Sequence, residues 1–257
     1  MDSAKGAPLQ DKTQKLSHYI TVKKGQKEPV KLVFKDLGMQ VSWTTVFLVE
    51  YFGPIAITLL LLFFREQIYG SNPPLVYGQK IGVAMALIHY IKREYETLFV
   101  HRFSNDTMPW TNIIKNSTHY WAIFGFLSMY FLLHPKYTTP VWLTTTMYND
   151  IFFCEFLFCE VMNFQCHCIL RDLRKPGTTE RGIPQGNLFG MVSCANYFWE
   201  SMAWLIFAMM TQVLGAYIFF AFSSVQMCIW ALKKHRMYKK EFPNYPKERR
   251  AMFPYLI

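Results

Sequence analysis

Two polar rows interrupt long apolar stretches of this sequence, and each has the spacing of one helix face. Asn196, Tyr197 and Glu200 stand in an apolar run. Amide and ionisable side chains at membrane depth are costly unless they face partners or a water-filled cavity, so they are the first candidates for function. Asn196 and Glu200 are four residues apart and share a helix face. We expect this face to point at a ligand.

The second row is Asn163, His167 and Arg171, again at intervals of four residues. It leads from an apolar segment into a basic loop, and arginine binds phosphate through paired hydrogen bonds. The row therefore suits a ligand with phosphates at the membrane edge and a polar ring deeper in. The alternative is that these groups only join helices by hydrogen bonds, which is the weaker explanation for the whole set because each would need a structural partner.

Several other chemistries are disfavoured by spacing. No two of the seven histidines lie within four residues, whereas a helix that offers two metal ligands on one face needs a spacing of three or four. None of the six cysteines forms a CxxC pair. We expect no metal. Glycine-rich nucleotide loops and a GxSxG elbow are also missing from the sequence.

The composition is that of an integral membrane protein. Hydrophobic residues make up 52% of the 257 residues and are clustered into long runs. The net charge of +10 comes from basic residues between these runs, where they indicate topology and contacts to anionic ligands. Nucleic acid is therefore not an expected partner, and the lipid bilayer is.

The chain divides into a polar cytosolic lead-in, residues 1–35, and a membrane domain, residues 36–257. The lead-in has a possible small hairpin within residues 19–34. Gly53-Pro54 should kink or break the first span, and residues 94–117 are expected to lie partly on the membrane surface. The predicted spans are residues 43–64, 75–91, 119–133, 141–168, 188–210 and 214–232.

Charge supports this count. Lysines and arginines gather before residue 36, in 92–117, in 171–181 and after 232, and outside these segments only Arg65, Lys80 and Lys136 remain. Six spans with both termini in the cytosol satisfy the positive-inside rule. The predicted fold is an all-α, polytopic membrane helix bundle with six transmembrane helices, seven being the alternative count.

Four motifs occur in order along the chain: Phe34–Trp43, Glu50–Pro54, His89–Ser104 and Ser193–Tyr197. They closely resemble motifs of the very-long-chain trans-2-enoyl-CoA reductases, which belong to the steroid 5α-reductase superfamily. The resemblance covers about residues 32–257. The segment Ile183–Phe189 looks as much like the steroid branch as the enoyl branch, so the resemblance defines the cofactor better than the substrate.

The resemblance implies NADPH as cofactor and several site residues. In the enoyl branch Tyr197 and Lys92 are implicated in catalysis, and in the steroid branch Glu50 and Tyr90 would hold the substrate carbonyl. His167 stands where the steroid branch has an acid. The cofactor contacts implied are Asn163, Arg171, Arg174, Asn196, Glu200, Tyr238 and Arg249.

The function implied is NADPH-dependent reduction of a long-chain trans-2-enoyl-CoA in the endoplasmic reticulum membrane, the last step of very-long-chain fatty acid elongation. Other elongation enzymes are then expected partners. We expect Tyr90, supported by Glu50, to donate to the thioester oxygen, and Tyr197, oriented by Lys92, to protonate the α-carbon. Two alternatives stay open: a reductase of a steroid or polyprenol enone, and a non-catalytic membrane scaffold of the same fold.

Overall fold

The computed structural model describes residues 38–103, 107–140, 145–174 and 182–257. The chain divides into two units, Met1–Leu37 and Gly38–Ile257, and every described element belongs to the second. The predicted lead-in and its hairpin lie outside the described residues.

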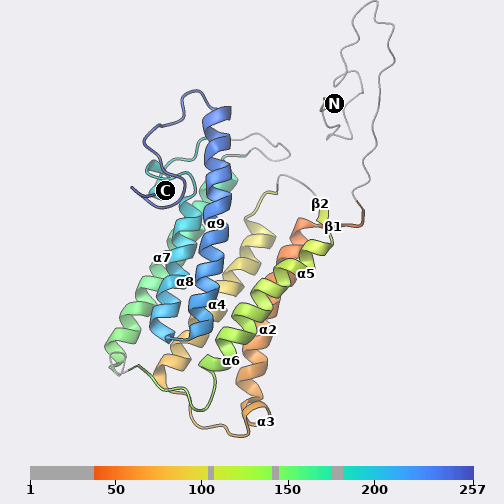
Figure 1. Ribbon diagram of the computed structural model, residues 1–257, viewed down its shortest axis with the longest axis vertical. Helices are drawn as coiled ribbons and strands as arrows, with labels where there is room; N and C mark the ends of the chain where they lie inside the picture. The colour runs from red at the N-terminus through yellow and green to blue at the C-terminus, as the bar shows by residue number, and fades with distance from the viewer. Residues whose placement is uncertain (1–37, 104–106, 141–144, 175–181) are drawn as a thin grey trace, which may run out of the picture. The chain divides into compact units, whose positions relative to one another are not determined.

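The second unit is a helix bundle, as predicted (Figure 1). Helices α5, η1 and α6 follow one another directly, η1 being π-helical. The long helices pack mainly as neighbours, with α7 against α8, α2 against α4 and α8 against α9. The helices are α2 (Trp43–Phe63), α3 (Arg65–Tyr69), α4 (Tyr77–Phe99), α5 (Thr111–Ser117), η1 (Thr118–Ser128), α6 (Met129–Leu132), α7 (Thr146–Asp172), η3 (Asn187–Gly190), α8 (Ala195–Thr211) and α9 (Leu214–Glu241).

Three described helices, α2, α7 and α9, are long and apolar enough to cross a membrane. Each of the other predicted spans also coincides with helix: 75–91 with α4, 119–133 with η1 and α6, and 188–210 with η3 and α8. The membrane character of the chain is therefore supported, while the count of six spans stays a prediction.

Helix α4 extends to Phe99, past the predicted span end at Ile91. The extension places Lys92, Arg93 and Glu96 on the helix that carries His89 and Tyr90. Beyond it, β1 (Gln40–Ser42) and β2 (Thr107–Pro109) form an antiparallel ribbon that the sequence did not predict. The ribbon is only three residues a strand, which is too short to give a clear alternating pattern.

Helix α8 begins at Ala195, although the apolar run predicted a start near Leu188. The backbone before it pairs with the C-terminal tail: Ser193 N donates to Arg250 O at 2.8 Å, and Cys194 N donates to Ala251 O at 3.1 Å. These contacts replace helical hydrogen bonds. As a result, Asn196 and Tyr197 lie in the first turn of α8, at the helix end, and not in its middle.

Helix α2 runs unbroken through Gly53-Pro54, so of the expected kink or break the break is absent, and the kink stays a prediction. Trp121 of η1 occupies the space beside Gly53, where a Cβ would lie 1.9 Å from Trp121 Nε1. The same nitrogen donates to Val49 O at 3.1 Å. A glycine is therefore required at this close approach of two helices.

Candidate active site

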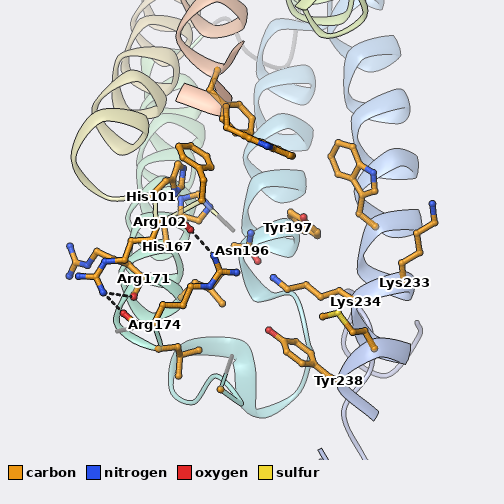
Figure 2. A pocket seen from close by; sticks show the side chains of 18 of the residues that line it. His101, Arg102, His167, Arg171, Arg174, Asn196, Tyr197, Lys233, Lys234 and Tyr238 are labelled. Atoms are coloured by element: carbon orange, nitrogen blue, oxygen red, sulfur yellow. Dashed lines mark hydrogen bonds between the residues drawn. The ribbon is translucent and has the colours of Figure 1, made fainter. Parts of the chain in front are cut away.

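A cavity of about 580 Å³ lies where α7 ends, α8 begins and the second half of α9 passes by (Figure 2). The end of α4 and the start of α2 complete its walls. Six of the eleven site residues expected from the sequence do not line the cavity. The other five do: Arg171, Arg174, Asn196, Tyr197 and Tyr238.

The cavity is cationic on two sides. Figure 2 shows Arg171 and Arg174 on one side and Lys233 and Lys234 of α9 on the other. Arg93 and Arg102 also line it, and no acidic side chain does among the residues that the structure describes. A concave surface of one charge sign concentrates ligands of the opposite sign. The geometry thus suits a ligand that carries several anionic groups.

Arg102 and Arg174 are held in place by each other's backbone. Arg174 Nη1 donates to Arg102 O at 2.6 Å, and Arg102 Nη1 donates to Arg174 O and, at 3.2 Å, to Arg171 O. The segment after α4 is therefore joined to the end of α7. This arrangement holds two of the cationic groups in place before any ligand arrives.

Aromatic rings form another wall. Phe103 stacks on both Trp43 and Phe47, with ring centroids 6.1 Å and 5.4 Å apart. Across the cavity, Tyr197 lies beside Trp230, with centroids 6.3 Å apart. A flat ring of a ligand would find stacking partners here, next to the cationic groups.

Below the cavity, five side chains from three helices form a closed ring of contacts, which we call the polar ring. His89 Nδ1 lies 2.8 Å from Glu160 Oε1, and His89 Nε2 lies 3.2 Å from Glu200 Oε1. Lys92 Nζ bridges Glu160 Oε2 at 2.6 Å and Asn163 Oδ1 at 2.7 Å. Asn163 Nδ2 donates to Glu200 Oε2 at 3.1 Å and so closes the ring.

A side-chain hydrogen bond of Asn163 joins the polar ring to the cavity wall. Asn163 Nδ2 also donates to the backbone oxygen of Asn196, at 2.9 Å. The side-chain Oδ1 of Asn196 is buried and has no hydrogen-bond partner in the described structure. Buried polar atoms are nearly always paired, so this oxygen marks a place where a ligand donor would bind.

Tyr90 and Glu50 lie deeper in the bundle and do not line the cavity. Each is 1% exposed. Glu50 Oε2 accepts from Asn116 at 2.8 Å, while the Tyr90 hydroxyl is buried with no partner among the described residues. The described residues show no hydrogen bond between Tyr90 and Glu50, and the expected support of Tyr90 by Glu50 stays a prediction. The unpaired Tyr90 hydroxyl is consistent with a role as hydrogen-bond donor to a substrate oxygen.

The expected roles of Arg249 and Lys92 differ from the contacts that these residues make in the structure. Arg249 is 3% exposed and donates to Pro184 O and to Gln185 Oε1, at 3.1 Å and 3.2 Å. It joins the C-terminal tail to the segment before η3, and its contact with a cofactor stays a prediction. Lys92 is engaged in the polar ring, so its expected action on Tyr197 also stays a prediction.

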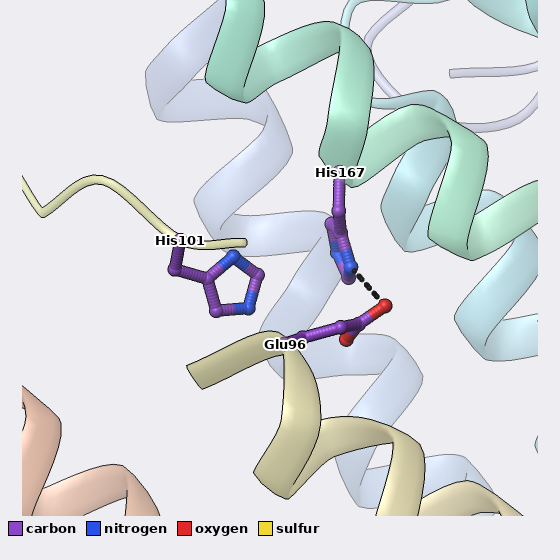
Figure 3. Close-up of side chains that lie close together, drawn as sticks. All are labelled: Glu96, His101 and His167. Carbon is purple, nitrogen blue, oxygen red and sulfur yellow. Dashed lines mark ion pairs between the residues drawn. The ribbon is translucent and has the colours of Figure 1, made fainter. Parts of the chain in front are cut away.

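Glu96, His101 and His167 come together beside the cavity, with donor atoms within 4.8 Å of one another (Figure 3). The spacing argument against metals considered single helices and missed this cluster, since His101 lies in the segment after α4 and His167 on α7. Arg93 Nη1 is 2.6 Å from Glu96 Oε2 and 3.4 Å from a nitrogen of each histidine. A guanidinium among the three groups opposes a second cation there.

His101 is the member of this cluster outside the helices. Burial, with the nearby charge of Arg93, lowers the pKa of His101 to about 3. The imidazole is therefore neutral at physiological pH and can accept from Arg93. The cluster is an arginine-centred set of hydrogen bonds and ion pairs that borders the cavity.

No role was assigned to His89 or Glu160 from the sequence. The sequence contained a signal for their role. His89 and Lys92 are three residues apart, as are Glu160 and Asn163. Each pair shares a helix face. The sequence indicated basic surfaces around Arg102 and around Lys233 and Lys234, but it did not predict that these residues and Arg93 line one cavity.

Comparison with known proteins places the chain in one family. A family model for 3-oxo-5-alpha-steroid 4-dehydrogenase matches residues 106–257. A very-long-chain enoyl-CoA reductase of Dictyostelium discoideum is 45% identical over 228 residues, which are 88% of this chain and 74% of that protein. A probable very-long-chain enoyl-CoA reductase of Caenorhabditis elegans is 40% identical over 98% of this chain and 82% of its own length.

A human trans-2,3-enoyl-CoA reductase-like protein is 36% identical, over 94% of this chain and 69% of that protein. The relatives therefore match almost the whole chain, including the helices that build the cavity and the polar ring. The resemblance found in the motifs is confirmed. The chain belongs to the very-long-chain enoyl-CoA reductases, within the 3-oxo-5-alpha-steroid 4-dehydrogenase family.

Proposed function

We propose that this protein reduces a long-chain trans-2-enoyl-CoA to the saturated acyl-CoA with NADPH. The observation that carries the proposal is the cavity lined by six cationic and several aromatic side chains, with the unpaired Asn196 Oδ1 at its wall. Phosphates suit the cationic sides, a flat ring suits the aromatic wall, and an amide N–H suits the Asn196 oxygen. The volume of about 580 Å³ lies in the usual range of ligand pockets.

The residues that would hold NADPH are those of the cavity wall: Arg171 and Arg174 on one side, Lys233 and Lys234 on the other, and Asn196 with its unpaired side-chain oxygen. When bound, the reduced nicotinamide supplies a hydride to the β-carbon of the substrate. As that bond forms, the π electrons of the double bond move towards the thioester oxygen. The protein must stabilise this charge and protonate the α-carbon.

Tyr197 is the proposed acid for the α-carbon. It lines the cavity, and its hydroxyl has no hydrogen-bond partner within the described parts of the chain. The phenol gives its proton to the α-carbon and is reprotonated from water through the open side of the cavity. Tyr90 is the proposed donor to the thioester oxygen, where a positioned O–H stabilises charge that develops in the transition state.

The cellular setting is also a proposal. The three apolar helices support a membrane protein. We infer the endoplasmic reticulum, cytosolic termini and a place at the end of fatty acid elongation, beside other elongation enzymes. The names of the relatives and the charge pattern of the sequence support this inference.

The proposal is tested with the purified full chain in detergent. NADPH consumption is followed with trans-2-hexadecenoyl-CoA and, in parallel, with a 4-ene-3-oxo steroid, because the family model bears the steroid name. We expect turnover with the enoyl-CoA. Turnover with the steroid and none with the enoyl-CoA would indicate a steroid reductase instead of an enoyl-CoA reductase. No NADPH oxidation with either would indicate a non-catalytic scaffold.

A further inference from the structure

The polar ring contains two residues, His89 and Glu160, that the proposed reaction does not use. Both are almost fully buried, at 1% and 4% exposure. Buried charges are expensive unless each is matched. Their presence at this depth therefore requires an explanation beyond packing.

Geometry defines the state of His89. Its two ring nitrogens face carboxylate oxygens of different helices, Glu160 Oε1 on α7 and Glu200 Oε1 on α8. Carboxylates accept hydrogen bonds and do not donate them. With both carboxylates ionised, each ring nitrogen donates a hydrogen bond and carries a proton, which makes His89 a cation. With Lys92, it balances the two carboxylates, and the ring is formally neutral.

The ring fixes Glu200 and Asn163, and Asn163 is hydrogen-bonded to the cavity-lining residue Asn196. Each oxygen of Glu200 has one fixed donor, His89 Nε2 or Asn163 Nδ2. Asn163 is oriented in turn by Lys92, which binds its oxygen and leaves its N–H groups for Glu200 and the Asn196 backbone. The orientation of Asn163 and Glu200 therefore depends on the other members.

We propose that His89 and Glu160 are positioning residues for hydride transfer. Glu160 holds both His89 and Lys92, and these two orient Glu200 and Asn163. Asn163 is in turn hydrogen-bonded to Asn196, the cavity-lining residue with the unpaired side-chain oxygen. The inference rests on the proposed function. Neither residue touches substrate or cofactor; they act through Glu200 and Asn163.

Two single variants, His89→Gln and Glu160→Gln, and the double variant are compared by unfolding temperature and kcat. The comparison separates the positioning role of these residues from their role in charge balance. Each single change leaves the ring with an unmatched charge and is expected to lower the unfolding temperature. The double variant removes one charge of each sign, so the unfolding temperature recovers. Its kcat stays low, by about 10-fold to 100-fold, because small misplacement of reacting groups slows transfer strongly.

Two readouts distinguish positioning from a structural role. With NADPH deuterated at C4, the double variant should show a larger isotope effect on kcat than the wild type, since hydride transfer becomes the slow step. Its KM for NADPH should change less than its kcat. The matched control is His134→Gln, at a histidine in the loop after α6 that accepts from Lys136 N and lies far along the chain from the ring.

The outcomes are distinct. A double variant that regains stability, wild-type kcat and the wild-type isotope effect would make the ring a structural device and overturn the inference alone. A His89→Gln variant with unchanged kcat would overturn it too. Wild-type protein that does not oxidise NADPH with the enoyl-CoA would instead reject the proposed function.

Discussion

Asn163 on α7 donates one hydrogen bond to the backbone oxygen of Asn196 on α8, at 2.9 Å, and another to the carboxylate of Glu200, at 3.1 Å. One amide nitrogen thus joins the two polar rows of the sequence. It also connects the buried polar ring with the wall of the cavity.

Tyr197→Phe should retain folding and NADPH binding but lose turnover by about 10²-fold to 10⁴-fold, the usual contribution of a positioned acid. The hydroxyl makes no hydrogen bond with the described residues, so its removal breaks no structural contact. NADPH fluorescence measures whether the variant still binds the cofactor, and steady-state kinetics measure the loss of turnover. Near-normal turnover would remove Tyr197 from the mechanism.

Arg171→Ala should raise the KM for NADPH by about 10-fold or more and change kcat little, since a charged hydrogen bond to phosphate contributes mainly to binding. Arg171 lines the cavity, and within the described parts of the chain its guanidinium pairs with the adjacent Asp172. The control is Arg236→Ala, an exposed arginine on α9 that does not line the cavity. Equal effects of the two changes would argue against a phosphate contact at Arg171.

Tyr90→Phe should leave the free energy of unfolding within about 1 kcal/mol of the wild type, because the hydroxyl that it removes has no described partner. Turnover should fall by about 10²-fold to 10³-fold if the hydroxyl binds the developing oxyanion. Thermal unfolding and kcat are measured on the same preparation. Full activity with unchanged stability would leave Tyr90 as a packing residue.

Gly53→Ala should destabilise the bundle by about 1–3 kcal/mol, because the added methyl overlaps Trp121 and displaces its hydrogen bond to Val49. The matched change is Gly190→Ala, where a Cβ meets no atom within 4 Å. The prediction is checked by comparing the unfolding temperatures of the two variants in the same detergent. A Gly53→Ala protein as stable as Gly190→Ala would show that Trp121 moves aside freely.

Acid should weaken the fold partly through His101. The pKa of His101 is lowered to about 3 by burial, below its usual value near 6.5, so between these values the unfolded chain binds the extra proton. Stability from this group is present above about pH 6.5 and is lost as pH falls towards 3. The drop in unfolding temperature from pH 7.5 to pH 5 should shrink in His101→Gln. An unchanged drop would mean that His101 is protonated in the folded state.

The sequence predicted the helix bundle and the polar rows because both depend on local periodicity. Four-residue spacing placed each row on one helix face, and the structure shows that Asn163 joins the two rows through Asn196 and Glu200. The start of α8 at Ala195 was missed, because it depends on a backbone pairing with Arg250 and Ala251 far along the chain. The β1–β2 ribbon was missed for a similar reason.

The composition of the site was less predictable than its location. His89 contacts Glu160 and Glu200 from two other helices, and such partners depend on how helices rotate against one another. The same holds for His101 and His167, which are distant in sequence. Helical spacing selects a face of one helix but does not identify the face that it meets.

Transfer of a labelled hydrogen is the decisive measurement. The purified chain is incubated with trans-2-hexadecenoyl-CoA and NADPH that carries deuterium at both C4 positions, and the product is analysed by mass spectrometry. We predict hexadecanoyl-CoA with one deuterium, at the β-carbon, and a solvent hydrogen at the α-carbon. Two results would contradict the proposal that the cavity binds NADPH for enoyl reduction. One is a saturated product without deuterium, and the other is no product from folded protein supplied with both substrates.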